Sequence, residues 1–566
     1  MKWLNYENVK ANEKTQTELK EKLGIPEYIL KVFINRGITS LKDAEEIFKI
    51  DEAPLHDPFL FENMQKAVDR IARAMKENEK IMIYGDYDVD GVTSIAILYL
   101  FIKKFLKYEN VNFYIPHRRE EGYGLNIEAL KGIKEEGYKL IITVDCGISA
   151  LNEVKFCNEN EMDIIITDHH IAETETPGAW AVINSKVSKT YPDKELSGVG
   201  TAYKLICAIA KDKTLDIKDY FLDFVALGTV ADIVPLTYEN RILVRRGLKK
   251  IKNTVNLGLK ALKEVAGIKK DADISTYHLG FILGPRINAA GRLEHAKKAV
   301  ELFISDDADK VMEIAQALNE ANNERKELMK KTETEAIEKL KGKFNPAEDF
   351  VIVLYDETWH AGIVGLVASK IVSKFNRPTF ILTKEEENGQ VHGSARSLQN
   401  VNIYEALQAV AAELLRYGGH KLAAGVTLLE ANIPNFTKQL NEYLKKTTTI
   451  ADFEQALYID SEITNEAILL RDIRTLEKLE PWGPGNPKPL FSMKGVDVKD
   501  VKFFKGNTMK FYAKHRDKTY NFITFGVQDE MKEKVKPGEI LDVVFTPSIN
   551  VWNDEENIIL EVKDIK

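Results

Sequence analysis

Cysteine is scarce in this sequence, with three residues in 566: Cys146, Cys157 and Cys207. Their number and spacing match neither a disulfide framework nor a metal-binding motif, so we expect three reduced thiols. Long hydrophobic runs are also lacking, because none reaches the roughly 18 residues of a membrane span. Residues 1–14 contain no hydrophobic region of the kind found in secretory signals. These absences predict a soluble, cytoplasmic protein that does not associate with membranes.

An excess of positive charge is lacking as well. The sequence has 79 lysines and arginines against 87 aspartates and glutamates, for a net charge of −8. Any binding to nucleic acid must therefore depend on local basic grooves rather than on the charge of the whole surface. Hydrophobic residues make up 44% of the chain, which is enough for buried cores, and the length predicts about three or four domains.

An acidic segment at residues 86–91, DYDVDG, has the spacing with which an EF-hand calcium loop begins. Calcium binding would require a bidentate carboxylate at the twelfth loop position, which is Ile97. The apolar run at 81–84 predicts a buried strand before the segment, and the residues from Thr93 onward predict a helix after it. Three carboxylates in such a turn repel one another unless a cation lies between them, although a plain solvated turn stays open.

Three further apolar runs also lead to acidic residues. Each aspartate alone could form a turn or cap a helix. Helical segments separate the first three runs of the chain, which predicts a doubly wound parallel sheet whose strands end at one edge, where ligands bind. We expect all four acidic clusters to meet at that edge. The further runs and the residues that follow them are 139–144 with Asp145, 163–167 with Asp168, His169 and His170, and 224–230 with Asp232.

The candidate ligands of this edge are carboxylates and imidazoles, with no thiolate. Such a set favours Mn²⁺, with Mg²⁺ as a substitute, over Ca²⁺ or structural Zn²⁺. Five or more ligands are enough for two divalent metal ions that share an aspartate. Two ions about 3.5–4 Å apart lower the pKa of a bound water and hold the attacking and leaving oxygens of a phosphodiester in line. The pattern therefore predicts metal-dependent phosphodiester hydrolysis.

Ten motifs give the chain a resemblance to the RecJ family of single-stranded-DNA-specific exonucleases, within the DHH phosphoesterase superfamily. They are GDYDVDG (85–91), EGYGLN (121–126), VDCG (144–147), TDHH (167–170), GTVADIVPL (228–236), GPRINAAGRL (284–293), WHAGIVGLVASK (359–370), GSARS (393–397), GGH (418–420) and EPWGPGNPKPLF (480–491). The DHH motif alone indicates only the superfamily. GPRINAAGRL and EPWGPGNPKPLF narrow the resemblance to RecJ, and the similarity extends over nearly the whole chain.

The resemblance implies roles for the residues at matching positions. Asp145 would bridge two metal ions, and Asp86 and His170 would lie in direct contact with the metals or just behind the ligands. Tyr84 stands where many relatives have a histidine, so one metal would rely on Asp86 or water instead. The implied metal ligands are Asp86, Asp88, Asp90, Asp145, His169 and Asp232, and the implied catalytic residues are Asp88, Asp90, Asp145, His169, His170 and Asp232.

Short glycine-rich or aromatic motifs contain the residues that the resemblance assigns to DNA or phosphate contacts. Ser394 and Arg396 would recognise a terminal 5′ phosphate, because small residues let backbone amides approach a phosphate and arginine pairs with it through two nitrogens. A basic cluster at 241–252 has helical spacing without aromatics and predicts a solvated helix face. The assigned residues are Arg118, Tyr123, Arg286, Asn288, Arg292, Ser394, Arg396, Gly418, Gly419 and His420.

The domain organisation follows from changes of pattern along the chain. Residues 1–60 form an N-terminal helical segment, 61–305 the α/β DHH domain, 306–342 a long connecting helix, 343–449 an α/β domain similar to DHHA1, and 450–566 an OB-type β-barrel. Cations interleave with aromatic rings in the barrel, as on a platform for single strands. The platform residues are Lys502, Phe504, Lys510, Tyr512, Lys514 and Arg516.

These features predict a manganese- or magnesium-dependent exonuclease that degrades single-stranded DNA from its 5′ end. The family implies a single-strand-binding protein and a RecQ-type helicase as partners, and we expect a monomer. Two alternatives stay open: a DHH–DHHA1 phosphodiesterase of short oligonucleotides or cyclic dinucleotides, and a non-catalytic, Cdc45-like DNA-binding scaffold. The barrel argues against the first because a small substrate needs no strand platform, and retention of the acidic ligands argues against the second. Editing similar to that of alanyl-tRNA synthetase would share only the DHHA1 features.

Overall fold

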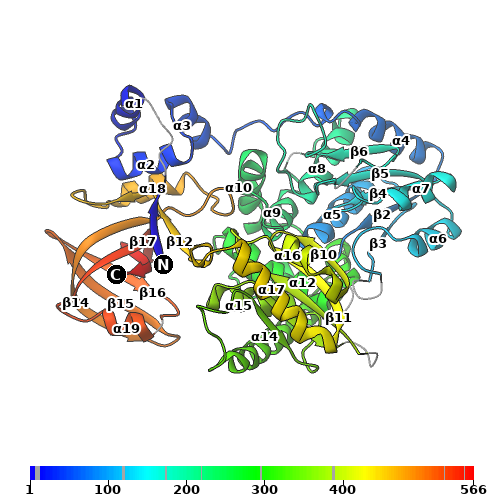
Figure 1. The fold of residues 1–566 in the computed structure, drawn as a ribbon. Helices are drawn as coiled ribbons and strands as arrows, with labels where there is room; N and C mark the ends of the chain where they lie inside the picture. The colour runs from blue at the N-terminus through cyan, green and yellow to red at the C-terminus, as the bar shows by residue number, and fades with distance from the viewer. Residues whose placement is uncertain are drawn as a thin grey trace.

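The computed structural model describes residues 1–566 except 7–12, 118–120, 173–174, 218, 294–295, 385–388, 528 and 554, and also leaves out the side chains of residues 14, 292, 293 and 552. The described residues form four sheets. In Figure 1 the sheet formed by residues 80–184, in the predicted DHH domain, lies on the right. The sheet formed by residues 352–429, in the DHHA1-like domain, lies at the lower centre, and the barrel of residues 491–565 lies on the left beneath the first three helices. The fourth sheet pairs β1 (Lys2–Asn5) with β12 (Ala456–Ile459).

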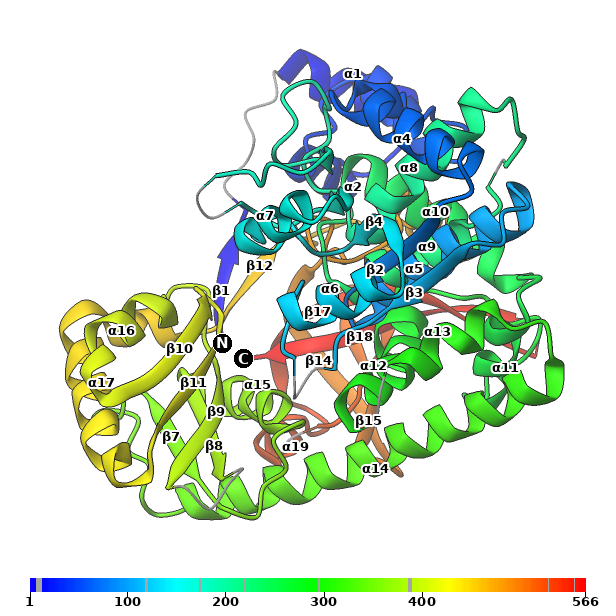
Figure 2. The ribbon, with the colours of Figure 1, turned by 90° about the vertical axis from the view of Figure 1, so that its right-hand side faces the viewer.

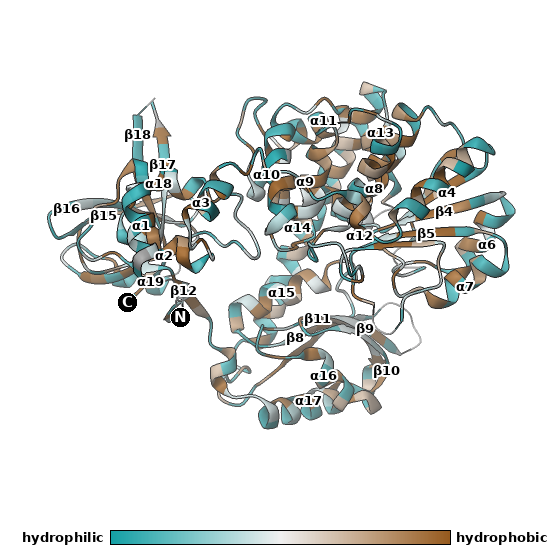
Figure 3. Cartoon of the chain, turned by 90° about the horizontal axis from the view of Figure 1, so that it is seen from above, coloured by the Kyte–Doolittle hydropathy of each residue, from teal (hydrophilic) through white to brown (hydrophobic). Residues whose placement is uncertain are grey.

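The predicted doubly wound domain is present, with five parallel strands in the order β3-β2-β4-β5-β6. The apolar runs at 81–84, 139–144 and 163–167 are strands, as predicted. Figure 3 shows β4 and β5 as hydrophobic strands, because buried parallel strands are apolar on both faces. The bounds are β2 (Lys80–Gly85), β3 (Val111–Tyr114), β4 (Tyr138–Val144), β5 (Asp163–Asp168) and β6 (Ala181–Asn184).

Helices cover both faces of this sheet. Ile81 and Ile83 of β2 share a hydrophobic core with α4, α5 and α8, whereas Met82 and Tyr84 share a second core with α6 and α7. The alternation of side chains along a strand places the two pairs on opposite faces. The helices are α4 (Met64–Lys76), α5 (Val89–Leu100), α6 (Ile127–Glu135), α7 (Leu151–Glu159) and α8 (Gly198–Asp212).

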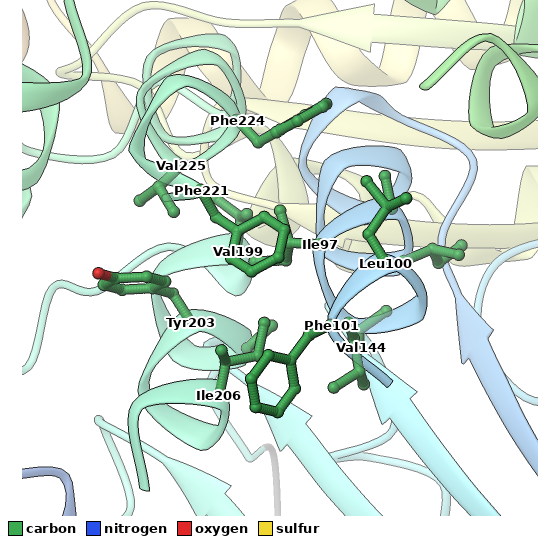
Figure 4. Packing of buried hydrophobic residues seen from close by; sticks show 14 of the residues in the cluster. Ile97, Leu100, Phe101, Val144, Val199, Tyr203, Ile206, Phe221, Phe224 and Val225 are labelled. Carbon is green, nitrogen blue, oxygen red and sulfur yellow. The ribbon is translucent and has the colours of Figure 1, made fainter. Parts of the chain in front are cut away.

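The fourth apolar run, 224–230, is not a strand of this sheet but lies within helix α9 (Leu222–Ala231). Figure 4 shows Phe224 and Val225 of α9 packed near Ile97 of α5 and Val199 of α8. A run that is apolar on all sides suits a buried helix as well as a buried strand. Gly228 lets the helices approach, since a Cβ there would lie 2.4 Å from Thr93 Oγ1 and 2.8 Å from Asp90 Oδ1. The end of α9 still brings Asp232 to the acidic edge.

The predicted connecting helix is α14, a single helix of 33 residues from Ala308 to Leu340. Figure 2 shows it running beneath the catalytic domain to the DHHA1-like sheet. It follows a helical region that packs on α5 and α9. That region consists of α10 (Tyr238–Lys252), α11 (Leu257–Val265), a π-helical turn (His278–Leu283), α12 (Gly284–Leu293) and α13 (Lys297–Ile304).

The second α/β domain has a mixed sheet in the order β10-β11-β9-β8-β7, in which only β7 and β8 pair in parallel. Helix α15 packs on β8 and β9. The elements are β7 (Ile352–Tyr355), α15 (Val364–Phe375), β8 (Thr379–Lys384), β9 (Gln390–Arg396), α16 (Ile403–Ala409), β10 (Leu414–His420), β11 (Ala423–Leu429) and α17 (Ile433–Thr447).

The predicted barrel is present, and all five expected strands form. They pair in the order β14-β15-β16-β18-β17, and β17 pairs back with β14 to close the barrel. Helix α18 (Leu470–Glu477) packs on β17, and α19 (Asp529–Lys534) lies between β16 and β17 in sequence. The strands are β14 (Phe491–Phe504), β15 (Thr508–His515), β16 (Lys518–Thr524), β17 (Ile540–Trp552) and β18 (Glu555–Ile565).

The N-terminal helices share one hydrophobic core with the barrel. Tyr28 and Phe33, which are 1% and 0% exposed, belong to the same buried cluster as Phe491 and Phe545. The Tyr28 hydroxyl also donates to Asp472 Oδ2 at 2.6 Å. The segment that we expected as a separate unit is therefore part of the barrel module. Its helices are α1 (Glu13–Leu23), α2 (Glu27–Asn35) and α3 (Leu41–Phe48).

The basic face of α10 is not simply solvated, which corrects the sequence-based expectation. Arg241 donates to the carbonyl of Leu479 at 2.7 Å, and Arg245 donates to the carbonyls of Glu477 and Glu480. Arg246 donates to the carbonyl of Asp51 at 3.0 Å. These arginines join the catalytic domain to the barrel module, and sequence spacing alone does not distinguish such contacts from exposure to water.

Candidate metal centre

The first three acidic residues, Asp86, Asp88 and Asp90, lie where β2 leads into α5. Asp88 is the N-cap of α5, and its Oδ1 accepts from the amide of Gly91 at 3.0 Å. Asp90 is in the first turn of α5 and is fully buried. Its two carboxylate oxygens accept from the amides of Gly198 and Val199 at 2.7 and 2.8 Å. The N-terminus of α8 thus holds Asp90 in place and stabilises its charge.

The remaining predicted ligands surround His169, which follows β5. Its Nε2 lies 3.2 Å from Asp145 Oδ1, 3.5 Å from Asp232 Oδ2 and 4.0 Å from Asp90 Oδ2. Asp145 follows β4, and Asp232 is the C-cap of α9. Helix ends and parallel strands that are distant in sequence therefore deliver these side chains to one place, as expected for the carboxyl edge of such a sheet.

The six predicted ligands and His170 form three overlapping groups, each with ligand atoms within 4.8 Å of one another. The groups are Asp86 with Asp88 and Asp145, Asp90 with His169 and Asp232, and Asp145 with His169 and His170. Asp145 and His169 each occur in two groups, and of the two only the carboxylate of Asp145 has two oxygens with which to bridge a pair of ions. Asp145 Oδ1 and His169 Nε2 are both buried. Although they lie 3.2 Å apart, neither atom forms a hydrogen bond with any described residue. Buried polar atoms without partners fit a set of metal ligands, because an ion would satisfy them.

The protonation of the centre also fits a metal site. Burial and the neighbouring carboxylates raise the pKa of Asp90 to about 7 and that of Asp232 to about 9. The same causes raise the pKa of Asp145 well above its ordinary value. Burial lowers the pKa of His169 to about 3, so the imidazole stays neutral and keeps a lone pair for a metal. A divalent cation would replace the protons that the carboxyl groups hold.

Glycines allow the acidic side chains to converge. Asp145 itself has a left-handed φ of 60°, which aspartate and asparagine tolerate better than most residues. Its carboxylate lies against Gly198, where a Cβ would be 2.5 Å from Asp145 Oδ1. A Cβ at Gly91 would lie 2.4 Å from the carbonyl oxygen of Asp86. A side chain at either glycine would therefore displace a predicted ligand.

His170 faces a cavity of about 630 Å³ between the two α/β domains. Its Nδ1 lies 2.8 Å from Asp168 Oδ1. Although burial acts to lower it, the hydrogen bond to Asp168 raises the pKa of His170. The Tyr123 hydroxyl lies 3.2 Å from the same ring nitrogen. Tyr123 and His170 line the cavity from the catalytic domain and His420 from the DHHA1-like domain.

Sequence reasoning did not assign a role to Asp168 or to the start of α8. Asp168 accepts from the amides of Ile148, His169 and His170, so it fixes the turn that carries both histidines. Ser197 is the N-cap of α8 and accepts from the amide of Gly200 at 3.1 Å. A serine followed by a helical pattern signals an N-cap in the sequence. No sequence pattern shows that its free amides hold Asp90.

The predicted phosphate residues of the DHHA1-like domain lie in two places. Ser394 and Arg396 extend from β9 over Gly365 in the first turn of α15, where a Cβ would lie 3.1 Å from Arg396 Nη2 and 3.4 Å from Ser394 Oγ. Gly418, Gly419 and His420 end β10 and are exposed. Gly419 has a φ of 140°, and a Cβ there would lie 2.4 Å from the carbonyl oxygen of Ala423.

The remaining residues predicted to contact DNA or phosphate are Arg286, Asn288, Arg118 and Arg292, and no contact in the structure joins them to Ser394, Arg396 or His420 among the described residues. Arg286 is 8% exposed and donates to Asn319 Oδ1 at 3.0 Å and to the carbonyl of Ile282 at 2.5 Å. Asn288 is half-buried on the same helix. Arg118 and the side chain of Arg292 lie outside the described residues. Contact of these residues with DNA stays a prediction.

Tyr84 is fully buried, and its hydroxyl donates to the carbonyl of Gly124 at 3.1 Å and accepts from Asn126 Nδ2 at 3.3 Å. Its ring stacks on Tyr114. The hydroxyl is thus occupied by contacts with the loop before α6, which accords with the expectation that Tyr84 supplies no metal ligand. Whether one ion relies on Asp86 instead stays a prediction.

The predicted platform lies on the outer surface of the barrel. Along β15, Met509, Phe511 and Ala513 are buried, whereas Lys510, Tyr512 and Lys514 alternate with them and point outward. Lys502 and Phe504 lie on β14 opposite β15, and Arg516 is exposed in the turn before β16. Phe504, Lys510 and Tyr512 line a groove of about 1100 Å³.

We predict that metal binding strengthens as the pH rises, because Asp90 and Asp232 must lose protons when a metal binds. Because the pKa of Asp90 and that of Asp232 are raised, their protonated forms stabilise the metal-free fold, and this stabilisation is lost as the pH rises through about 7 and about 9. A metal must displace these protons, so its apparent affinity should rise up to about tenfold per pH unit for each proton. Thermal unfolding with Mn²⁺ and with EDTA at pH 6 and pH 8 tests this, and an equal metal-induced rise in Tm at both values would contradict it.

Family models match three parts of the chain: the DHH family, N-terminal domain at residues 80–229, the DHHA1 domain at 348–446 and the RecJ OB domain at 459–564. The chain is 37% identical to the single-stranded-DNA-specific exonuclease RecJ of Bacillus subtilis over 99% of this chain and 70% of that protein. It is 32% identical to that of Escherichia coli, over 82% and 83%.

Solved structures give the same result. The structure of RecJ in complex with Mn²⁺ from Thermus thermophilus superposes with a TM-score of 0.83 at 28% identity, covering 100% of this chain and 79% of that one. The corresponding complex with Mg²⁺ has a TM-score of 0.79 at 26% identity, covering 100% and 78%. With three matching domains and two relatives above 30% identity, the chain belongs to the RecJ family.

Proposed function

We propose that the chain is a metal-dependent exonuclease that hydrolyses single-stranded DNA from the 5′ end and releases 5′-mononucleotides in DNA repair and recombination. The observation that carries the proposal is the convergence of Asp90, Asp145 and Asp232 within 4.0 Å of His169 Nε2. The relatives are single-stranded-DNA-specific exonucleases, and the similar Thermus structures contain Mn²⁺ or Mg²⁺.

Different side chains would have different roles in hydrolysis. Asp86, Asp88, Asp90, Asp145, His169 and Asp232 would hold two divalent ions, Mn²⁺ or Mg²⁺, which activate a water and neutralise the phosphate. Asp168 orients His170 through Nδ1, so Nε2 of that ring is the nitrogen left for a phosphate oxygen in the cavity. The Tyr123 hydroxyl lies 3.2 Å from His170 Nδ1 and donates to the carbonyl of Asp145 at 3.3 Å, so it joins the two residues at this side of the cavity.

The barrel favours long strands over small substrates. Its outer groove of about 1100 Å³ combines Phe504, Tyr512 and Lys510, whose Nζ lies 5.3 Å from the Tyr512 ring centroid. Rings and cations in alternation suit stacked bases and the phosphates between them. A phosphodiesterase of short oligonucleotides or cyclic dinucleotides would not need this surface, which supports the exonuclease.

One incubation tests the proposed function. The protein should release label first from 5′-labelled single strands with Mn²⁺ or Mg²⁺, and it should leave duplex DNA largely intact. Release of label first from 3′-labelled strands would overturn the polarity, and equal cleavage of dinucleotides and long strands would favour the small-substrate alternative. A parallel RNA strand measures whether a 2′-hydroxyl is accepted.

The proposal extends to the setting of the enzyme. A nuclease confined to single strands requires a source of unwound DNA, which a RecQ-type helicase and a single-strand-binding protein would supply. Among the described residues no helix is long and apolar enough to cross a membrane. A cytoplasmic location and a monomeric state complete the proposal, and sedimentation of the purified protein tests the latter.

Arg396→Ala is predicted to erase most of the preference for a 5′ phosphate. A terminal phosphate carries more charge than an internal one, and the first turn of α15 beside Arg396 and Ser394 offers backbone amides and a guanidinium to it. Wild type should cut 5′-phosphorylated strands at least about tenfold faster than 5′-hydroxyl strands, because a 5′-hydroxyl strand cannot make the charge-assisted contact with Arg396. In Arg396→Ala neither strand can make that contact, so the two rates should become similar.

Initial rates on the two strands give the measurement. Arg416→Ala serves as the control, because Arg416 is an exposed arginine on β10 of the same domain. Metal-induced thermal stabilisation should be unchanged in both variants, since neither residue is a predicted ligand. A full phosphate preference in Arg396→Ala would place the recognition of the 5′ end elsewhere.

A further inference from the structure

The loop after β6 contributes a lysine to the cavity between the two α/β domains. Lys186 lines this cavity beside His170, whereas two other side chains of the wall, Glu153 and Asp168, are acidic. Among the described residues, Lys186 is the only lysine or arginine in the wall. The acidic metal centre adjoins the cavity at His170, which belongs to one of the ligand groups. A phosphate that enters the cavity therefore meets mostly carboxylates, and Lys186 is the side chain that offers it a permanent positive charge.

The register of two neighbouring strands places Lys186 beside the turn that carries the histidines. Asp168 pairs with Asn184 across β5 and β6, which lie side by side in Figure 1. Neighbouring strands are about 4.8 Å apart. His170 and Lys186 each follow the paired residue of their strand by two positions. The two turns therefore leave the carboxyl edge of the sheet together, at the place where ligands bind in parallel sheets.

Asn184 holds the two turns in this arrangement. Its side chain is buried, and its Nδ2 donates to the carbonyl of His170 at 2.9 Å. Its Oδ1 accepts from the amide of Lys186 at 2.9 Å and from that of Val187 at 3.3 Å. A buried amide that bonds to two adjacent turns fixes their spacing. The backbone of Lys186 thus has a defined position beside His170, although its side chain is exposed.

The ammonium group of Lys186 has no partner within the part of the chain that the structure describes. It pairs with no carboxylate and donates no hydrogen bond there. Its charge nevertheless reaches the metal centre. Burial and the carboxylates of Asp90 and Asp88 raise the pKa of Asp232, and Lys186 acts against them. A lysine is a point charge on a flexible stem, so this ammonium can turn toward an anion in the cavity.

We propose that Lys186 binds a non-bridging oxygen of the scissile phosphate when a strand occupies the cavity. The inference deepens the proposed function and rests on it, because the ligand is a phosphodiester of the substrate strand. Together with His170 Nε2, the ammonium would contact the phosphate from the ends of two neighbouring strands. Such a charge-assisted contact strengthens as negative charge develops on the phosphate oxygens in the transition state. The motifs of the family resemblance do not include Lys186, and they assign it no role.

Steady-state rates on a single strand with Mn²⁺ test this contact. Lys186→Met keeps the length of the side chain and removes its charge, so kcat/KM should fall about 10- to 100-fold, as for the loss of a hydrogen bond to a charged group. Lys186→Arg keeps the charge and should recover most of the loss. Lys189→Met is the matched control, because Lys189 is an exposed lysine of the same loop that does not line the cavity.

Two further measurements locate the contact. The loss in Lys186→Met should be equal on a tetranucleotide and on a long strand, because both place a phosphate at the metal centre and only the long strand would reach the barrel. A loss confined to long strands would overturn the placement in the cavity. The Mn²⁺-induced rise in Tm should be at least as large as in wild type, since a neighbouring cation opposes metal binding. A smaller rise would show that Lys186 supports the metal ligands rather than the phosphate.

The outcomes separate this inference from the proposed function. If wild type cuts single strands and Lys186→Met keeps the kcat/KM of wild type, the contact of Lys186 alone is overturned. If wild type does not cut single strands, the proposed function fails and the contact fails with it. If Lys186→Arg recovers nothing and both variants lower Tm in EDTA by several degrees, Lys186 has a structural role and the inference is wrong.

Discussion

Asp145→Asn is expected to abolish hydrolysis, with the rate on single-stranded DNA reduced by at least about a thousandfold, while the protein stays folded. Metal ions supply several kcal/mol of transition-state stabilisation in such sites. Asp145 belongs to two of the three ligand groups, so its loss weakens both predicted metal positions together. The remaining carboxylates repel one another less, since the charges of Asp90 and Asp232 contribute to the raised pKa of Asp145.

The choice of asparagine follows from the backbone. Asp145 has a φ of 60°, where alanine would add strain of about 1 kcal/mol and asparagine adds little. Circular dichroism and Tm in EDTA check the fold, and the loss of the Mn²⁺-induced rise in Tm checks the metal. Asp69→Asn, an exposed acid on α4, is the control. A folded Asp145→Asn protein that cuts at near the wild-type rate would remove Asp145 from the centre.

Deletion of residues 450–566 alone is expected to yield an insoluble protein. The deletion would uncover Tyr28, Ile29, Leu30 and Phe33 of α2, each at most 1% exposed in the whole chain. Each such side chain loses about 1.5–3 kcal/mol when its burial is lost. The exposed apolar surface would drive aggregation.

A matched deletion separates folding from DNA binding. Residues 54–449 keep His56, whose amide donates to Glu239 Oε1 at 2.7 Å, but lack both α1–α3 and the barrel. This shorter chain should be soluble and should cut short oligonucleotides at saturation. Its affinity for long strands should fall, with a shallower salt dependence because fewer phosphates are neutralised. Solubility, anisotropy and rates provide the measurements, and full solubility of residues 1–449 would contradict the shared core.

Local patterns were sufficient to predict most of the fold. The short apolar runs that lead to Asp145 and Asp168 are buried parallel strands, which are apolar on both faces because helices cover both sides of the sheet. The five barrel strands followed from alternation and turns. The acidic edge could be predicted because parallel strands end on one side, which placed Asp145 and His169 together without knowledge of the distances.

The rest depended on contacts between distant segments. The run at 224–230 is part of helix α9, which packs against α5, α8 and α10. Its apolar composition suits a buried helix and a buried strand equally well. Arg241 and Arg245 bind carbonyls more than 200 positions away, at separations of 238 and 232. Asp90 depends on amides 108 and 109 positions away. No local pattern contains such pairings, so tertiary structure was needed to find them.

The core shared by α1–α3 and the barrel has a consequence for synthesis on the ribosome. The helices end at Phe48, and the barrel strands begin at Phe491, so about 440 residues are made between them, which takes on the order of 20–90 s at typical bacterial rates. During that time the apolar face of α2 has no partner, while the catalytic domain can already fold. We expect ribosome-bound chains to bind chaperones through α2, and polar substitutions on that face to change chaperone binding before they change catalysis.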